Sequence, residues 1–233
     1  MLVLAFPAQA FGTNCYVVAP AAGEQALVVD PGIGVVDQLR EVLAEHRLKP
    51  AAVLLTHGHL DHVFSVTPVC TTGDDADLAA YIHADDRYRL QDPAASLDPQ
   101  LVAMFEQQFG AAWTWREPPV VEQVRDHQHL DLAGLGVDVL HAPGHTEGSV
   151  MFTLPGAPDG VPVEASSTVL AGDVLFAGSI GRTDLPGGDH DAMMRSLREV
   201  VLPLPDDALI LPGHGPATTM VRERAANPYL TGL

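Results

Sequence analysis

Apolar residues fall in short runs along most of the chain, and turns rich in glycine and proline separate these runs. The first three runs, at residues 1–7, 14–20 and 25–32, are rich in valine and leucine and predict the strands of a meander. Residues 34–47 instead repeat apolar residues at helical spacing and predict a helix. The run "AAVLLT" at 51–56 has no polar alternation, which predicts a strand that is buried on both faces.

The rest of the chain mixes the two kinds of pattern. Further strands are expected at residues 79–84, 135–143, 149–155, 166–176 and 207–215. Further helices are expected at residues 64–70, 99–109, 190–204 and 218–230, with a loop at 113–119. Strands mixed with helices over the whole length predict sheets covered by helices. The length of 233 residues suits one domain, residues 1–233.

Composition narrows the classes of function. The formal net charge is -18 and Lys49 is the only lysine, so the surface repels phosphate backbones and anionic membranes. We therefore expect neither a nucleic-acid partner nor a membrane partner. The apolar N-terminus lacks the basic residues of a signal peptide, and Cys15 and Cys70 have no metal-binding spacing. We expect both cysteines to be buried free thiols, which persist in a reducing compartment, and we therefore expect a cytoplasmic protein.

Titratable side chains gather where the predicted strands end. The segment "THGHLDH" at residues 56–62 follows a buried strand, and three other strands end in a glycine-containing turn that carries a histidine or an aspartate. If these strand ends meet at one edge of a sheet, imidazoles and carboxylates without thiolates suit a pair of borderline divalent ions. The seven candidate ligands are His57, His59, Asp61, His62, His145, Asp173 and His214.

The order of these seven residues resembles the metal signature of the metallo-β-lactamase superfamily, and the likeness extends from "TNCY" at residues 13–16 to His214. The resemblance implies an α/β (α+β) fold, a four-layer αβ/βα sandwich of two mixed β-sheets with helices outside. It implies one metal on His57, His59 and His145, a second on Asp61, His62 and His214, and Asp173 as a bridge. Zinc is the first expectation for both ions, with iron or manganese as alternatives.

Two longer segments, "GDVLFAGSIGRTDLPGGD" and "GHGPATTMVRERAANPYL", resemble short glyoxalase II-like (hydroxyacylglutathione hydrolase-like) enzymes. This likeness implies a binuclear hydrolase that cleaves a small-molecule thioester with a hydroxide shared by the two metals. Asp61 and Asp173 would then act in catalysis. Typical long glyoxalase II enzymes have a Lys and a Tyr on the loop where Arg182 and Asp184 stand, so we expect these two residues to contact the substrate. Arg182 either holds a substrate carboxylate or pairs with Asp184 to shape the loop.

Two other functions stay open. The segment "GRTD" is shared with persulfide dioxygenases, which bind a single iron, and His57, His145 and Asp173 would hold it. The third possibility is a metal-binding protein without catalysis. The oligomeric state is not predicted.

A second histidine-rich segment, "HQHLD", contains His127 and His129 but precedes a strand, so an exposed loop is expected there. His83 and His141 lie within strand-like runs and are expected to be structural.

Overall fold

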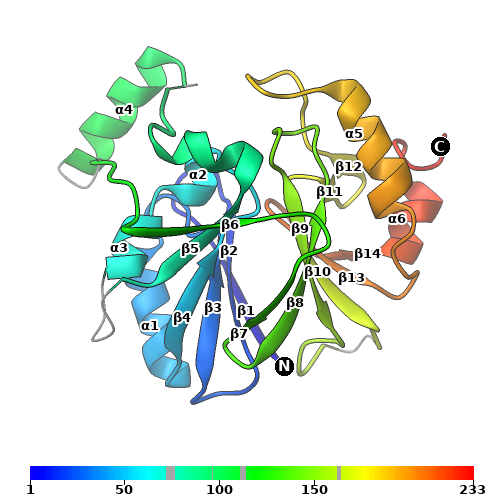
Figure 1. Ribbon diagram of the computed structural model, residues 1–233, viewed down its shortest axis with the longest axis horizontal. Coiled ribbons are helices and arrows are strands. Elements are labelled where there is room, and N and C mark those ends of the chain that lie inside the picture. The colour runs from blue at the N-terminus through cyan, green and yellow to red at the C-terminus, as the bar shows by residue number, and fades with distance from the viewer. Residues whose placement is uncertain (72–76, 96, 111–113, 162–163) are drawn as a thin grey trace.

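The computed structural model describes residues 1–71, 77–95, 97–110, 114–161 and 164–233, and its strands form two large sheets (Figure 1). The first sheet takes its strands in chain order: β1 (Leu2–Pro7), β2 (Asn14–Ala19), β3 (Gln25–Val29), β4 (Lys49–Leu54), β5 (Ala79–His83) and β6 (Val120–Val124). Strands β1 to β3 pair antiparallel, whereas β3 to β6 pair parallel. The sheet is therefore mixed.

The second sheet is mixed as well. It runs in the order β14-β13-β10-β9-β8-β7, and only β10 and β13 pair parallel. Its strands are β7 (His129–Leu132), β8 (Leu135–His141), β9 (Val150–Pro155), β10 (Ser167–Gly172), β13 (Leu209–Pro212) and β14 (Thr218–Thr219). A short hairpin, β11 (Leu175–Phe176) and β12 (Ser179–Ile180), follows β10.

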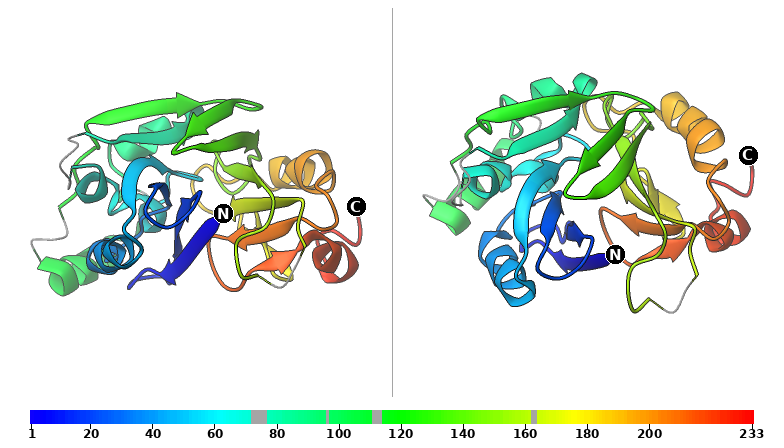
Figure 2. Two further views of the ribbon diagram at one scale, coloured as in Figure 1. Left: turned by 90° about the horizontal axis from the view of Figure 1, so that it is seen from below. Right: turned by 60° about the horizontal axis from the view of Figure 1, so that its bottom comes forward.

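Some helices cover the outer faces of the two sheets, and others lie at the edge where the strands end (Figure 1). They are α1 (Val36–His46), α2 (Leu60–Val63), α3 (Val66–Thr71), the 3₁₀-helix η1 (Ala84–Leu90), α4 (Pro99–Phe109), α5 (His190–Ser196), the π-helical turn η3 (Leu197–Val201) and α6 (Met220–Ala226). In Figure 1, α1 and α3 lie outside the first sheet, and α5 and α6 lie outside the second; the views of Figure 2 show the same layers from other sides. This is the predicted four-layer sandwich.

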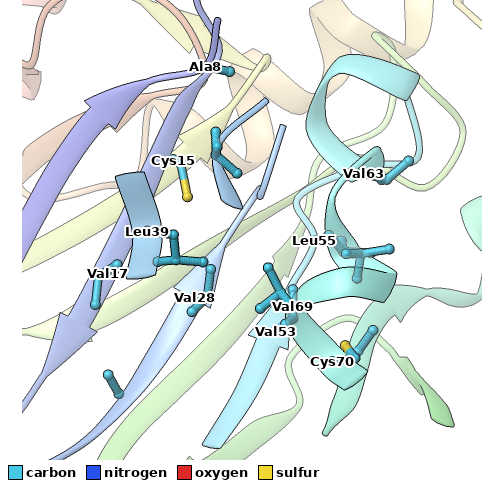
Figure 3. Close-up of a cluster of buried hydrophobic side chains, with 14 of the residues drawn as sticks. Ala8, Cys15, Val17, Val28, Leu39, Val53, Leu55, Val63, Val69 and Cys70 are labelled. Carbon is cyan, nitrogen blue, oxygen red and sulfur yellow. The ribbon is translucent and has the colours of Figure 1, made fainter. Parts of the chain in front are cut away.

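The apolar strands of the first sheet bury both of their faces. In β2, Val17 packs toward Leu39 of α1, whereas Tyr16 and Val18 belong to the cluster between the sheets. Figure 3 shows Val17, Val28 and Val53 of successive strands in the cluster under the helices. Burying apolar surface on both sides explains why these strands read as continuous hydrophobic runs.

The strands of the second sheet also bury apolar side chains on both faces. Met151, Val169 and Ile210 pack with residues of α5 and α6, while Phe152 and Leu170 fill the space between the two sheets. The two sheets thus share one central core, and each sheet also has an outer core under its own helices. This packing fixes how the ends of the strands stand relative to one another.

Several sequence predictions need correction. The helix expected at 64–70 is present as α3 (Val66–Thr71), preceded by the separate short helix α2, whereas the one expected at 218–230 begins only after the short strand β14. His129 is the first residue of β7 and not part of a loop. Of the loop expected at 113–119, Trp113 lies outside the described residues, and residues 114–119 form no helix or strand.

Among the described residues, no helix combines the length and apolar character needed to cross a bilayer.

Phe152 provides a test of the central core because it is fully buried between the sheets. Phe152→Ala should lower the free energy of unfolding by about 3–5 kcal/mol, since it removes an aromatic ring and leaves a cavity. Denaturant titration measures the effect. Phe11→Ala is the matched control, because Phe11 is 49% exposed and should cost much less. Equal losses for the two variants would contradict this view of the core.

Candidate metal centre

All seven predicted ligands lie at one edge of the sandwich, just beyond the ends of strands. His57, His59, Asp61 and His62 follow β4, and the last two of these stand in the first turn of α2. His145 lies between β8 and β9, Asp173 follows β10, and His214 follows β13. The structure therefore brings together every ligand that the sequence pattern predicted.

The first ligand set consists of three imidazoles. Nδ1 of His59 lies 3.1 Å from Nε2 of His57 and 2.8 Å from Nε2 of His145. Two nitrogens bound to one tetrahedral zinc ion stand about 3.3 Å apart, given zinc–nitrogen bonds of about 2.0–2.1 Å. All three rings are at least 90% buried. Three converging nitrogens at this spacing suit a single divalent ion.

The second ligand set combines one carboxylate with two imidazoles. Oδ2 of Asp61 lies 3.2 Å from Nε2 of His214 and 3.6 Å from Nε2 of His62. Asp173 stands between the two sets: its Oδ2 is 3.5 Å from Nε2 of His145, and its Oδ1 is 3.4 Å from Nε2 of His62. Its carboxylate is thus placed to bridge two ions.

Two buried atoms of this centre support metal binding directly. Nε2 of His62 and Oδ1 of Asp173 have no hydrogen-bond partner among the described residues, although both are buried. A buried polar atom without a partner costs about 1–3 kcal/mol. A divalent ion between these atoms would supply the missing interaction. The residues present therefore fit a metal pair, and the free thiols Cys15 and Cys70 take no part in the ligand groups.

Asp30 orients the second set, and the sequence analysis missed it. Its side chain is 2% exposed and accepts hydrogen bonds from Nδ1 of His62 (2.9 Å) and from N and Oγ1 of Thr56 (2.8 and 2.7 Å). The bond to Nδ1 leaves Nε2 of His62 free to face the centre. Asp30 follows β3 directly, so the rule that identified the ligands, a carboxylate at a strand end, would also have found it.

Asp86 fixes the loops that carry the first set. This fully buried carboxylate accepts hydrogen bonds from N of Gly58 (2.7 Å), N of Gly148 (2.9 Å) and Oγ1 of Thr146 (2.7 Å). It also pairs with Arg89 at 3.2 Å. Because Gly58 lies between His57 and His59, and Thr146 follows His145, one side chain ties both loops together.

The two ligand sets differ in charge. Burial lowers the pKa of His57 well below its usual value and brings the pKa of His59 to about 3, and neighbouring imidazoles contribute to both shifts. Burial also acts to lower the pKa of His62, but Asp61, Asp173 and Asp30 outweigh it and raise that pKa well above normal. The first set therefore offers neutral imidazoles, as metal binding requires.

Arg182 and Asp184 lie on the loop after the β11–β12 hairpin. The guanidinium of Arg182 forms a bidentate pair with Asp184, at 2.7 and 2.8 Å, and both side chains are largely exposed. The backbone oxygen of Arg182 accepts a hydrogen bond of 2.7 Å from Nδ1 of His145. The loop thus orients a ligand through its backbone, while a role of these two side chains in substrate binding stays a prediction.

The other histidines lie outside the centre. His129 pairs with Asp138 at 2.6 Å on the surface, and the side chain of His127 is 81% exposed. His83 and His141 stack with ring centroids 3.9 Å apart and planes 12° from parallel. Together with Asp85 these two rings come close enough to hold an ion. However, lone pairs in nearly parallel ring planes do not converge on one point, which favours the predicted structural role.

The sequence model for the Metallo-beta-lactamase superfamily matches residues 8–214, which include all seven ligands. The chain belongs to this superfamily. A Mycobacterium tuberculosis relative, Rv2581c, is 43% identical over 234 residues, which cover 100% of this chain and 99% of the relative. Hydroxyacylglutathione hydrolase GloC of Haemophilus influenzae is 33% identical over 232 residues, 96% of this chain and 95% of the relative.

Solved structures of the superfamily share the fold over nearly the whole chain. BLEG-1, a B3 metallo-β-lactamase, superposes with a TM-score of 0.76 and 32% identity, covering 99% of this chain and 100% of that one. TTHA1623 in a di-iron-bound form has a TM-score of 0.74 and 33% identity, covering 97% and 100%. The family match and the converged ligands together support a metal-binding hydrolase of this superfamily.

Asp173→Asn tests the bridge between the two ligand sets. The substitution keeps the shape but removes the charge, so metal affinity should fall at least about 10- to 100-fold, the range typical of changes outside the ligand shell. Elemental analysis of the purified, folded variant measures the metal content. His129→Ala is the control and should retain the metal content of the unmodified protein. Normal metal content in Asp173→Asn would contradict a bridging role.

Asp30→Asn tests the orienting hydrogen bond to His62. Zinc affinity, measured by competition with a chromogenic chelator, should fall about 10- to 100-fold, because the uncharged amide has only one acceptor oxygen for the three hydrogen bonds that Asp30 accepts from Thr56 and His62. Asp37→Asn is the matched control: Asp37 is an exposed aspartate of α1 that pairs with Arg40 at 3.3 Å. If both variants bind zinc alike, Asp30 does not act through His62.

Proposed function

We propose that this protein is a binuclear metallo-hydrolase that cleaves a thioester of a low-molecular-weight thiol. The observation that carries the proposal is the pair of complete ligand sets joined by Asp173. Five of the seven ligands, His59, Asp61, His145, Asp173 and His214, line a cavity of about 380 Å³. The similarity to GloC, which its name describes as a hydroxyacylglutathione hydrolase, supports a thioester as the substrate.

In the overall reaction, water adds to the carbonyl carbon of the thioester, the carbon–sulfur bond breaks, and a carboxylic acid and a thiol are released. A bound pair of divalent ions would supply two things, a water of lowered pKa and polarisation of the carbonyl oxygen. The protein supplies orientation. Asp61 is held by a hydrogen bond of 2.8 Å from Oγ1 of Thr13, so its carboxylate has a fixed place in the lining of the cavity.

Zinc is the proposed metal at both sites, because neutral imidazoles and carboxylates suit it and the reaction needs no redox change. Iron is the main alternative, since the similar structure of TTHA1623 holds two iron ions. Hydrolysis does not depend on which of these ions is bound, whereas oxygen chemistry does. The choice of metal is therefore separable from the choice of reaction.

Arg182 lines the cavity, and we propose that Arg182 and Asp184 border the substrate. The guanidinium already forms two hydrogen bonds with Asp184, so a substrate carboxylate would have to replace Asp184. We further propose that the enzyme acts in the cytoplasm on small molecules, without nucleic-acid or membrane partners. Two buried free thiols and the net charge of -18 support this proposal.

The protein reconstituted with zinc should release thiol from lactoyl-thiol conjugates without consuming oxygen. The physical reason is that zinc has no redox chemistry but supports hydrolysis. A thiol-reactive dye and an oxygen electrode, used on the same sample, measure both quantities. Zinc-treated Asp173→Asn is the inactive control.

Oxygen uptake with a persulfide substrate, lost when zinc replaces iron, would instead identify a dioxygenase. Hydrolysis of β-lactams with no activity on any thioester would also overturn the proposal. Neither outcome would change the ligand assignment, which the metal analyses test separately.

A further inference from the structure

The cavity above the metal ligands has an apolar wall that the metal centre itself does not need. Its apolar lining consists of Phe11, Leu60, Leu97, Leu101, Leu185 and Pro186. Phe11, Leu97 and Leu101 come from the loop after β1 and from the region of α4, not from the strand ends that hold the ligands. The wall is therefore a separate feature of the site.

Phe11 is the most unusual part of this wall. Its ring is 49% exposed at the cavity, and it contacts the ring of Phe105 of α4 with centroids 5.3 Å apart. Its backbone has φ = 60°, a left-handed conformation that is rare for a bulky side chain. Such strain persists where the surrounding structure holds it, and it occurs often at ligand clamps. Apolar surface left open at this position favours an apolar ligand group.

The wall stands beside the second ligand set. Thr13, two residues after Phe11, donates a hydrogen bond to Asp61 and pairs through its backbone with His214. Leu60 directly precedes Asp61. A group attached to a carbonyl at the metal centre therefore lies within reach of the ring of Phe11.

The described side chains around the wall offer no free positive charge to pair with an anionic acyl group. Among the described lining residues, Arg182 carries the only fixed positive charge, and Asp184 already pairs with it. Asp98 adds a negative charge at the edge of the cavity, and the whole chain carries -18. The bound metal ions would attract the thioester carbonyl at the ligands, but at the wall a second carboxylate on the acyl group would find no free cation among the described lining residues.

We infer that the acyl group of the substrate is uncharged and apolar, of the size of a phenylacetyl or branched aliphatic group, and packs against Phe11 and Leu101. This inference rests on the proposed thioester hydrolysis. The acyl group is assigned to the wall because the wall is apolar, whereas a low-molecular-weight thiol carrier is polar and gains little from apolar surface. The carrier then extends past the exposed Arg182 into solvent, where the released thiol can leave.

Thioesters of N-acetylcysteamine test the inference, because they keep the thiol constant and neutral while the acyl group varies. For the zinc-loaded enzyme, kcat/KM should be at least about tenfold higher for the phenylacetyl than for the acetyl thioester, since even one methylene in an apolar pocket is worth roughly tenfold or more. The succinyl thioester should be cleaved no faster than the acetyl one. Equal rates for all three, or a preference for succinyl, would overturn the inference.

Two variants locate the effect. Phe11→Ala and Leu101→Ala should each reduce the phenylacetyl-to-acetyl ratio about tenfold. Met104→Ala is the matched control, because Met104 lies on the same helix as Leu101 and is 50% exposed, but does not line the cavity. An unchanged ratio in both wall variants, or an equal loss in Met104→Ala, would contradict the assignment of the wall.

A binding measurement separates failure of this inference from failure of the proposed function. Calorimetry with the zinc-loaded protein should show phenylacetate, the acid that hydrolysis would release, binding at least about tenfold more tightly than acetate, since each acid brings the same single carboxylate to the metal ions. If no thioester is cleaved but this order holds, the hydrolase proposal fails and the apolar wall stands. If thioesters are cleaved but acetate and phenylacetate bind equally, the hydrolase stands and the wall is rejected.

Discussion

The structure depends on the convergence of five imidazoles and two carboxylates at one edge of the sandwich. Most of these groups are removed from water, and burial without partners would cost several kcal/mol for the set. Two kinds of interaction compensate this cost. Bound metal ions would join the atoms that face one another, and buried carboxylates hold the ligands from behind, with Asp30 on His62 and Asp86 on the loops of His57 and His145. Neither kind of interaction would suffice alone, because an ion needs its ligands held in place before it binds.

Packing between the sheets is what makes this arrangement possible. The ligands come from strand ends of both sheets, so their spacing follows from the central core around Phe152 and Leu54. The backbone at Gly213 comes so close to two of the ligands that it restricts which residue can stand there. At Gly213, an added Cβ atom would lie 2.1 Å from Oδ1 of Asp173 and 2.7 Å from Cε1 of His62. Only a residue without a side chain fits there, and the glycine before His214 is thus a condition of the metal geometry.

Sequence reasoning found the seven ligands because each of them follows an apolar strand, and the order of the motifs indicated the family. It missed residues whose role arises only from tertiary contacts. Asp86 lies in η1, a 3₁₀-helix within the stretch where no periodic pattern was visible, and nothing local shows that it contacts two loops. The two-residue strands β11, β12 and β14 are too short to leave a pattern. Phe11 was not singled out, because an apolar residue beside a glycine is common and its left-handed backbone appears only in the structure.

If the proposed function holds, the residues for the reaction and those for specificity come from different parts of the chain. The ligands stand on strand ends that the core fixes, so they tolerate little change. The apolar wall, by contrast, is built from the loop after β1 and the region of α4, together with Leu185 and Pro186 from the loop that carries Arg182. Loops and short helices can change without disturbing the central core. Members of one superfamily can thus keep the same metal centre and act on different substrates. Similarity at the ligands therefore says more about the type of reaction than about which acyl group the substrate carries.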